Sequence, residues 1–293
     1  MAGASKKNPK RGEQKPQKSQ LEILKHTEEA ALTQLERSTT GLGLSGFSAG
    51  LDIGFSVLLM IVVLSLFKNV FPSPVVKFIV ASMYPIGFIF VVLGRSELFT
   101  EHTTLAVLPV LQRLASVKKL FRLWGIVYIS NIAGGLIFAA ILAYFAGSLH
   151  FIEEWALGEI ATELLHHDLL TNLLSAALAG WLMGLLAWLV AASRETISQI
   201  FIIFLVTSAI GIAGLPHCIV GNIEVSAGLF SGKLSFAQYL HFLLPVTIGN
   251  AAGGMIFVGI LKFNHSVYSG EEIEIDLDNE MGDKNNSSSG SNS

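Results

Sequence analysis

The stretch that decides the fold occurs twice, as ISNIAGGLIF at residues 129–138 and as IGNAAGGMIF at residues 248–257. Seven of the ten positions are identical, and the central asparagines, Asn131 and Asn250, lie 119 residues apart. The Gly-Gly pairs are typical of helices that pack closely inside a membrane, since small residues let two backbones approach. The chain therefore contains two copies of one helical plan.

Both copies lie in apolar surroundings. The chain has 293 residues, 52% of them hydrophobic and 14% charged, with a mean hydropathy of +0.59. Soluble domains carry roughly 25% charged residues, so an ordinary soluble domain is excluded. The net charge of −3 does not indicate a nucleic-acid partner, and the one cysteine, Cys218, excludes an intramolecular disulfide and a cysteine-rich metal site. We expect no cofactor and no metal.

Six stretches are apolar and long enough for a bilayer core of about 30 Å. Four are continuous, whereas two run into polar insertions that contain Gly or Pro and then continue briefly. The six stretches are 41–67, 75–94, 123–149, 169–193, 196–213 and 237–263. We predict an all-α membrane protein with a transmembrane domain over 41–265, embedded in the lipid bilayer.

The flanking segments are polar. Residues 1–20 and 266–293 are predicted to be disordered tails. Residues 21–40 are predicted to form an amphipathic helix at the membrane surface. Its apolar face would hold Leu21, Leu24, Ala31, Leu32 and Leu35.

The two interrupted stretches occupy equivalent places in the two halves. A shift of 119 residues places Leu98, in the first interruption, on His217 in the second. Each half, about 41–149 and 169–265, has three spans, so the second copy is inverted relative to the first. Broken helices in inverted repeats usually mark the substrate path of a transporter.

Lysine and arginine predict the orientation. With both termini on one side, that side holds fifteen Lys and Arg residues, whereas the other side holds Lys68, Lys77 and Lys233. The positive-inside rule then predicts cytoplasmic termini, with the acidic 150–168 loop outside.

The first interruption, residues 94–104, combines charge and hydroxyl groups. Thr100 is predicted to cap the half-helix that follows, with Glu101 in its first turn. Such a helix start attracts small anions. Arg95 is predicted to lie in the membrane, where an ion pair with Glu97 or Glu101 could simply hold the loop together.

The second interruption centres on His217. An ionisable group at this depth is costly and usually functional. Cys218 is expected to be a packing residue. The sequence leaves open whether Glu224 lies one or two turns beyond His217 or pairs with Arg95. The His166-His167-Asp168 run is interpreted as a solvated loop, since it lacks a further metal ligand at helical spacing.

Several motifs resemble those of the formate–nitrite transporter family, within it the branch typified by a bacterial inner-membrane protein. They are LFTEHTTLAVLPVLQ at 98–112, RLWG at 122–125, His217 followed by Ile-Val-Gly, and PVTIGNAAGG at 245–254. The resemblance covers about residues 40–265. It implies six tilted helices in an aquaporin-like arrangement and a homopentamer with one pore in each protomer. It also implies a bacterial or archaeal cytoplasmic membrane and no enzymatic activity.

The same resemblance implies a substrate path past Thr100 and His217, with an apolar constriction at Leu98, Phe99 and Ile210. We include Glu101, His102 and Asn222 in the expected path. Glu101 and His102 stand where formate and nitrite transporters have small polar residues, and Pro216 stands where a carboxylate is common.

The sequence thus favours a channel or secondary transporter for a small monovalent anion or its conjugate weak acid, coupled to protons through His217. The alternative is a pore of the same fold for a small cation or a neutral solute, favoured if Glu97, Glu101 and Glu224 are ionised. A membrane metalloenzyme has no HExxH motif to support it.

Overall fold

The computed structural model describes residues 18–257, and every structural statement below concerns that part of the chain. The predicted tails, apart from residues 18–20, and residues 258–265 of the predicted transmembrane domain lie outside it. The described residues form helices and no strands. The helices are α1 (Gln20–Glu36), α2 (Thr39–Phe67), α3 (Ser73–Met83), α4 (Pro85–Gly94), α5 (Phe99–Leu105), α6 (Leu108–Leu111), α7 (Val117–Phe145), α8 (Glu154–Glu163), α9 (Leu169–Ala192), α10 (Thr196–Ile212), α11 (Cys218–Phe230) and α12 (Phe236–Ile256).

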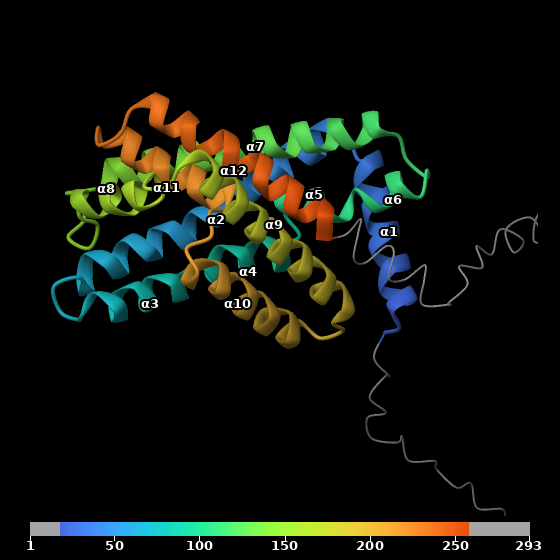
Figure 1. Ribbon diagram of the computed structural model, residues 1–293, viewed down its shortest axis with the longest axis horizontal. Helices are drawn as coiled ribbons and strands as arrows, with labels where there is room; N and C mark the ends of the chain where they lie inside the picture. Colours follow the sequence, from blue (N-terminus) through green and yellow to red (C-terminus); the bar gives the residue numbers. More distant parts are fainter. Residues whose placement is uncertain (1–17, 258–293) are drawn as a thin grey trace, which may run out of the picture.

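The long helices form a bundle whose ends are covered by shorter elements. In Figure 1, α2, α7 and α12 run along the long axis of the molecule, while α1 and α8 lie at opposite ends. Four helical segments of the described part are long and apolar enough to cross a membrane, at 39–67, 73–94, 117–145 and 169–192. The predicted all-α membrane fold is therefore confirmed.

The α2–α7 and α9–α12 pairs are built alike. A side chain at Gly50 of α2 would collide with the Asn131 carbonyl of α7, and one at Gly180 of α9 would collide with the Asn250 carbonyl of α12. Only glycine allows two helices to approach this closely. The repeated asparagine motif thus marks two equivalent helix crossings, which supports the inverted repeat.

A proline bend divides the span predicted at 75–94. Pro85 has no N–H to continue the helix, so α3 ends at Met83 and α4 begins at Pro85. Ser56 of α2 stabilises the bend, because its hydroxyl donates to the Tyr84 carbonyl at 2.6 Å and accepts from the Gly87 N–H at 2.8 Å. The two segments together still form one membrane span.

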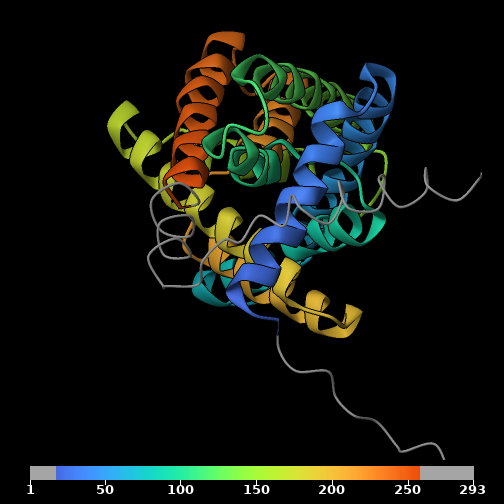
Figure 2. The ribbon, with the colours of Figure 1, turned by 90° about the vertical axis from the view of Figure 1, so that its right-hand side faces the viewer.

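The amphipathic segment at the N-terminus forms a helix that crosses the end of the bundle, as Figure 2 shows in an end-on view. Ser19 and Glu22 form a capping box at its start. Its buried face packs on the protein: Ile23 and Leu24 join Leu108, Trp188 and Phe257 in one apolar cluster. At the opposite end, the predicted 150–168 loop contains a helix, α8, that packs on α11.

Candidate functional site

The two predicted interruptions meet at the centre of the molecule. α4 ends at Gly94 and α5 begins at Phe99, whereas α10 ends at Ile212 and α11 begins at Cys218. The residues that precede the two half-helices are Leu98 and His217, as the 119-residue shift predicts. Thr100 Oγ1 lies 2.8 Å from His217 Nε2, so the two helix N-termini are in direct contact. From this contact the two half-helices extend toward opposite ends of the bundle (Figure 1).

Each half-helix is held by one asparagine of the repeated motif. The Asn131 side chain accepts from the Phe99 N–H at 2.8 Å and donates to the carbonyls of Glu97 at 2.9 Å and Gly46 at 2.7 Å. Unpaired backbone groups are costly in a membrane interior, and this amide satisfies them.

Asn250 does the same for the second break. Its side chain accepts from the Cys218 N–H at 2.8 Å and donates to the carbonyls of Pro216 at 3.0 Å and Ala176 at 2.8 Å. The partners of the two asparagines differ in residue type but match in position: one amide at the start of a half-helix, one carbonyl in the break, and one carbonyl of the neighbouring long helix.

The hydrogen bonds of His217 assign its neutral tautomer. The Val220 N–H donates to Nδ1 at 3.3 Å, so Nδ1 carries no proton while this bond holds. The ring proton then lies on Nε2 and is donated to Thr100 Oγ1. The Thr100 hydroxyl is then free to donate its own proton to another acceptor. Phe88 makes an edge contact with the imidazole, with ring centroids 5.2 Å apart.

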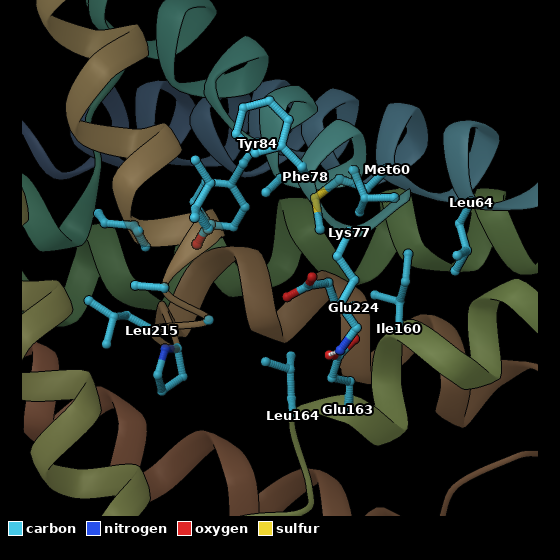
Figure 3. Close-up of a pocket in the computed structure, with 18 of the residues that line it drawn as sticks. Met60, Leu64, Lys77, Phe78, Tyr84, Ile160, Glu163, Leu164, Leu215 and Glu224 are labelled. Atoms are coloured by element: carbon cyan, nitrogen blue, oxygen red, sulfur yellow. Dashed lines mark hydrogen bonds and ion pairs between the residues drawn. The ribbon is translucent and has the colours of Figure 1, made fainter. Parts of the chain in front are cut away.

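A cavity of about 590 Å³ leads from the surface to His217. Its inner part includes His217, Ile210 and Pro216, and its outer part includes charged side chains of α3 and α8. Figure 3 shows Lys77 and Glu163 meeting at this outer part, where their ion pair is 2.7 Å long.

The three residues predicted to form the constriction are all buried. Ile210 lines the cavity, whereas Leu98 and Phe99 are not among the described residues that line it. Phe99 instead packs its ring against Trp124 and Tyr128. The path beyond His217 is thus closed by packed apolar side chains.

The charges of the first break are arranged differently from the prediction. Arg95 is exposed in a left-handed conformation (φ 56°), and the described residues offer it no ion pair with Glu97, Glu101 or Glu224. Glu97 is buried and pairs with Arg37 at 2.7 Å and with His102.

Two further expectations need correction or placement. Thr100 does not cap α5, because it lies inside the first turn and its hydroxyl faces His217; Leu98 precedes the helix without a side-chain cap. Glu101 lies in the first turn as predicted. Asn222 joins α11 to its neighbours, accepting from the Tyr239 hydroxyl at 2.7 Å and donating to the Ile132 carbonyl at 3.4 Å, and it does not line the cavity.

Sequence reasoning missed the part of Arg37, which lies 60 residues from its partner Glu97. It is the last basic residue before the first span. In the sequence it served only as one of the basic residues that predict the orientation. Glu224 lies two turns beyond His217, lines the cavity and is buried. His166 and His167 are exposed, as expected for a solvated loop.

Comparison with known proteins identifies the family of this chain. The family model for the formate/nitrite transporter matches residues 21–264. The chain belongs to the formate/nitrite transporter family. It is 30% identical over 248 residues to inner membrane protein YfdC of Escherichia coli, covering 83% of this chain and 77% of that protein. Members of this family are channels or transporters rather than enzymes.

Solved structures share the fold. An FNT family ion channel superimposes with a TM-score of 0.73 at 21% sequence identity, covering 84% of this chain and 99% of that one. A pentameric formate channel with formate bound gives a TM-score of 0.64 at 23% identity, covering 82% and 99%. The chain is therefore a multi-pass membrane protein with the family's channel fold.

Proposed function

We propose that the protein is a channel or secondary transporter for a small monovalent anion and its conjugate weak acid. The observation that carries this proposal is the contact between Thr100 and His217, where the N-termini of α5 and α11 meet at the inner end of the cavity. Both helix starts direct N–H groups and a partial positive charge toward one place. A small anion is attracted there, as formate is bound by the pentameric channel of similar fold.

Proton transfer lets the solute pass the apolar barrier. A bare anion loses many kcal/mol of hydration among Leu98, Phe99 and Ile210. The neutral acid loses far less. The Thr100 hydroxyl donates to the anion while His217 Nε2–H donates to Thr100. Once Nδ1 releases the Val220 N–H, it can take up a proton that balances the one passed through Thr100 to the anion. Imidazole suits this relay because it exchanges protons near neutral pH.

The assembly and orientation follow the same reasoning. We expect a homopentamer, since a solved channel of similar fold is pentameric. We also expect a bacterial or archaeal cytoplasmic membrane. Many large apolar side chains on α7 and α12 are exposed in the single chain, among them Ile129, Ile137, Leu244 and Ile248, and they are available for lipid or neighbouring protomers. The end that α1 crosses also holds Arg113 and Lys118, which favours its placement in the cytoplasm.

The test is uptake of formate, nitrite and acetate into proteoliposomes across pH, with two variants. His217→Asn keeps size and hydrogen bonding but cannot exchange protons, so we expect a loss of at least about tenfold and of acid stimulation. Thr100→Val keeps the volume and removes the hydroxyl, and should lower uptake while the oligomer stays intact. An unchanged pH profile in His217→Asn would make the histidine structural.

A pore of the same fold for a small cation or neutral solute is the second candidate. The observation that favours it is Glu224, a carboxyl group inside the cavity. Uptake of methylammonium by the wild-type protein, without uptake of any weak acid, would select this candidate.

A further inference from the structure

Glu224 carries a carboxyl group that the proposed relay through Thr100 and His217 does not use. It lies on α11, two turns beyond His217, and is 6% exposed. Its side chain lines the cavity, and Figure 3 shows its carboxyl group directed into the open space. Among residues 18–257 it has no ion pair and no hydrogen bond. A partnerless polar group aimed into a cavity is a candidate for contact with whatever enters.

The other charges of the cavity are already paired. Lys77 of α3 binds Glu163 of α8, and Lys68 at the end of α2 binds Glu159 of α8. Both pairs lie in the outer part and are substantially exposed. Glu224 is thus the buried acid left without a cation.

The remaining polar side chains of the cavity form no ion pair or hydrogen bond with Glu224 among the described residues. Tyr84, His167 and His217 also line the cavity. α12 brings Tyr239, whose hydroxyl is taken by Asn222, and α7 brings no ionisable side chain to the cavity among the described residues. The carboxyl group therefore faces a mixed polar and apolar space that is continuous with His217.

This placement has a consequence for anions. An ionised Glu224 would repel an approaching anion, and a lone ionised carboxylate is expensive to keep away from bulk water. A protonated Glu224 is neutral, can donate a hydrogen bond to the anion, and can pass its proton along that bond.

We propose that Glu224 is a proton donor of the cavity and selects anions of weak acids. This inference rests on the proposed function. The O–H bond of the Glu224 acid breaks, and the proton joins the anion to form the neutral acid, which moves on to His217. The carboxylate left behind regains a proton from hydronium that enters the cavity from the bulk solution on the acidic side. An anion of a strong acid accepts no proton, and the carboxyl group gives it no passage.

The experiment measures uptake into proteoliposomes of formate and acetate, and separately of chloride and nitrate, from pH 5 to 8. The variants are Glu224→Gln, which keeps shape but has no acid proton, and Glu224→Asp, which keeps the acid. Glu159→Gln, in the same cavity but paired with Lys68 at the surface, is the matched control. Size-exclusion chromatography and thermal unfolding establish that each variant assembles.

The expected result is a loss of weak-acid uptake of about tenfold or more in Glu224→Gln, with a flattened pH profile. Glu224→Asp should recover most of the uptake, and Glu159→Gln should stay within about twofold of wild type, since an exposed ion pair contributes little. Recovery by aspartate separates proton donation from a merely structural role.

Two results would overturn the inference, and they differ from failure of the proposed function. An assembled Glu224→Gln with wild-type rates and pH profile for formate excludes the donor role while weak-acid transport stands. Chloride or nitrate uptake by wild type equal to formate uptake excludes the selectivity. No weak-acid uptake by wild type at all instead removes the proposed function itself.

Discussion

The first and second breaks have the same support but different chemistry. Asn131 and Asn250 each hold one amide at the start of a half-helix and one carbonyl in the break. The residue before the half-helix is Leu98 in the first copy and His217 in the second. The asparagine therefore maintains the broken helix, while the position beside it is free to become an apolar barrier or a proton-exchanging group.

The two breaks also differ in how many additional contacts hold them. The first is tied to other helices by the ion pair of Glu97 with Arg37, by the Ser45 hydroxyl that accepts from the Glu97 N–H at 3.2 Å, and by the Ser96 hydroxyl that donates to Asp52 at 3.2 Å. The second break carries no ion pair within the described chain. The second break therefore depends more on Asn250.

The largest expected effect tests this dependence. Asn250→Ala leaves the Cys218 N–H and the Pro216 carbonyl without their partner, at a cost of about 1–3 kcal/mol for each buried group. We expect poor assembly and loss of uptake. Asn131→Ala removes the equivalent bonds, but Arg37, Ser45 and Asp52 still hold the first break, so the loss should be smaller.

The measurement is the thermal unfolding temperature in detergent together with the yield of oligomer. Asn250→Asp keeps the acceptor for Cys218 and should fall between wild type and Asn250→Ala. Equal losses in Asn131→Ala and Asn250→Ala would mean that the additional contacts of the first break contribute nothing.

The sequence predicts the shared part of the two breaks better than their differences. The 119-residue shift correctly aligns Leu98 with His217, because the helix breaks and the asparagines are both required by the same backbone geometry. Arg95 was expected to pair with a carboxylate of the first break, whereas it is exposed and Glu97 pairs with Arg37 instead. The pairing of Glu97 with Arg37 joins α1 to a distant break and leaves no periodic signal in the sequence.

The ion pair of the first break provides a second, intermediate test. Arg37→Gln leaves Glu97 buried with His102 as its remaining partner, which should destabilise the protein. The loss should be less than the roughly 3–5 kcal/mol of a fully buried pair, because the Arg37 side chain is 38% exposed. Adding Glu97→Gln removes the charge that needed compensation.

We therefore expect the Arg37→Gln/Glu97→Gln double variant to unfold at a higher temperature than Arg37→Gln alone. Lys119→Gln, whose partner Glu36 lies at the exposed end of α1, is the control and should have little effect. A double variant that is less stable than both single variants would show that the charges contribute independently, and the proposed extra support of the first break would be wrong.

The smallest expected effect concerns the helices that carry the two glycine contacts. α2 begins after Ser38, whose hydroxyl accepts from the Gly41 N–H, and α9 begins after Asp168, whose carboxylate accepts from the Thr171 N–H at 2.8 Å. The positions are equivalent, but only the second cap can titrate. Hydrogen bonding to Thr171 lowers the pKa of the exposed Asp168 carboxyl below its usual range. A group whose pKa is lowered in the folded state contributes stability that is fully present above its ordinary pKa. That contribution is lost as the pH falls through the lowered value.

Wild type should therefore lose stability below about pH 4. Asp168→Ser should lose less over that interval and should resemble wild type at neutral pH, because serine is also a good cap. The reciprocal Ser38→Asp should add the same acid-sensitive contribution at the start of α2. Thermal unfolding in detergent from pH 3 to 6 measures both, and an identical acid response in wild type and Asp168→Ser would mean that the cap of α9 does not distinguish the two halves.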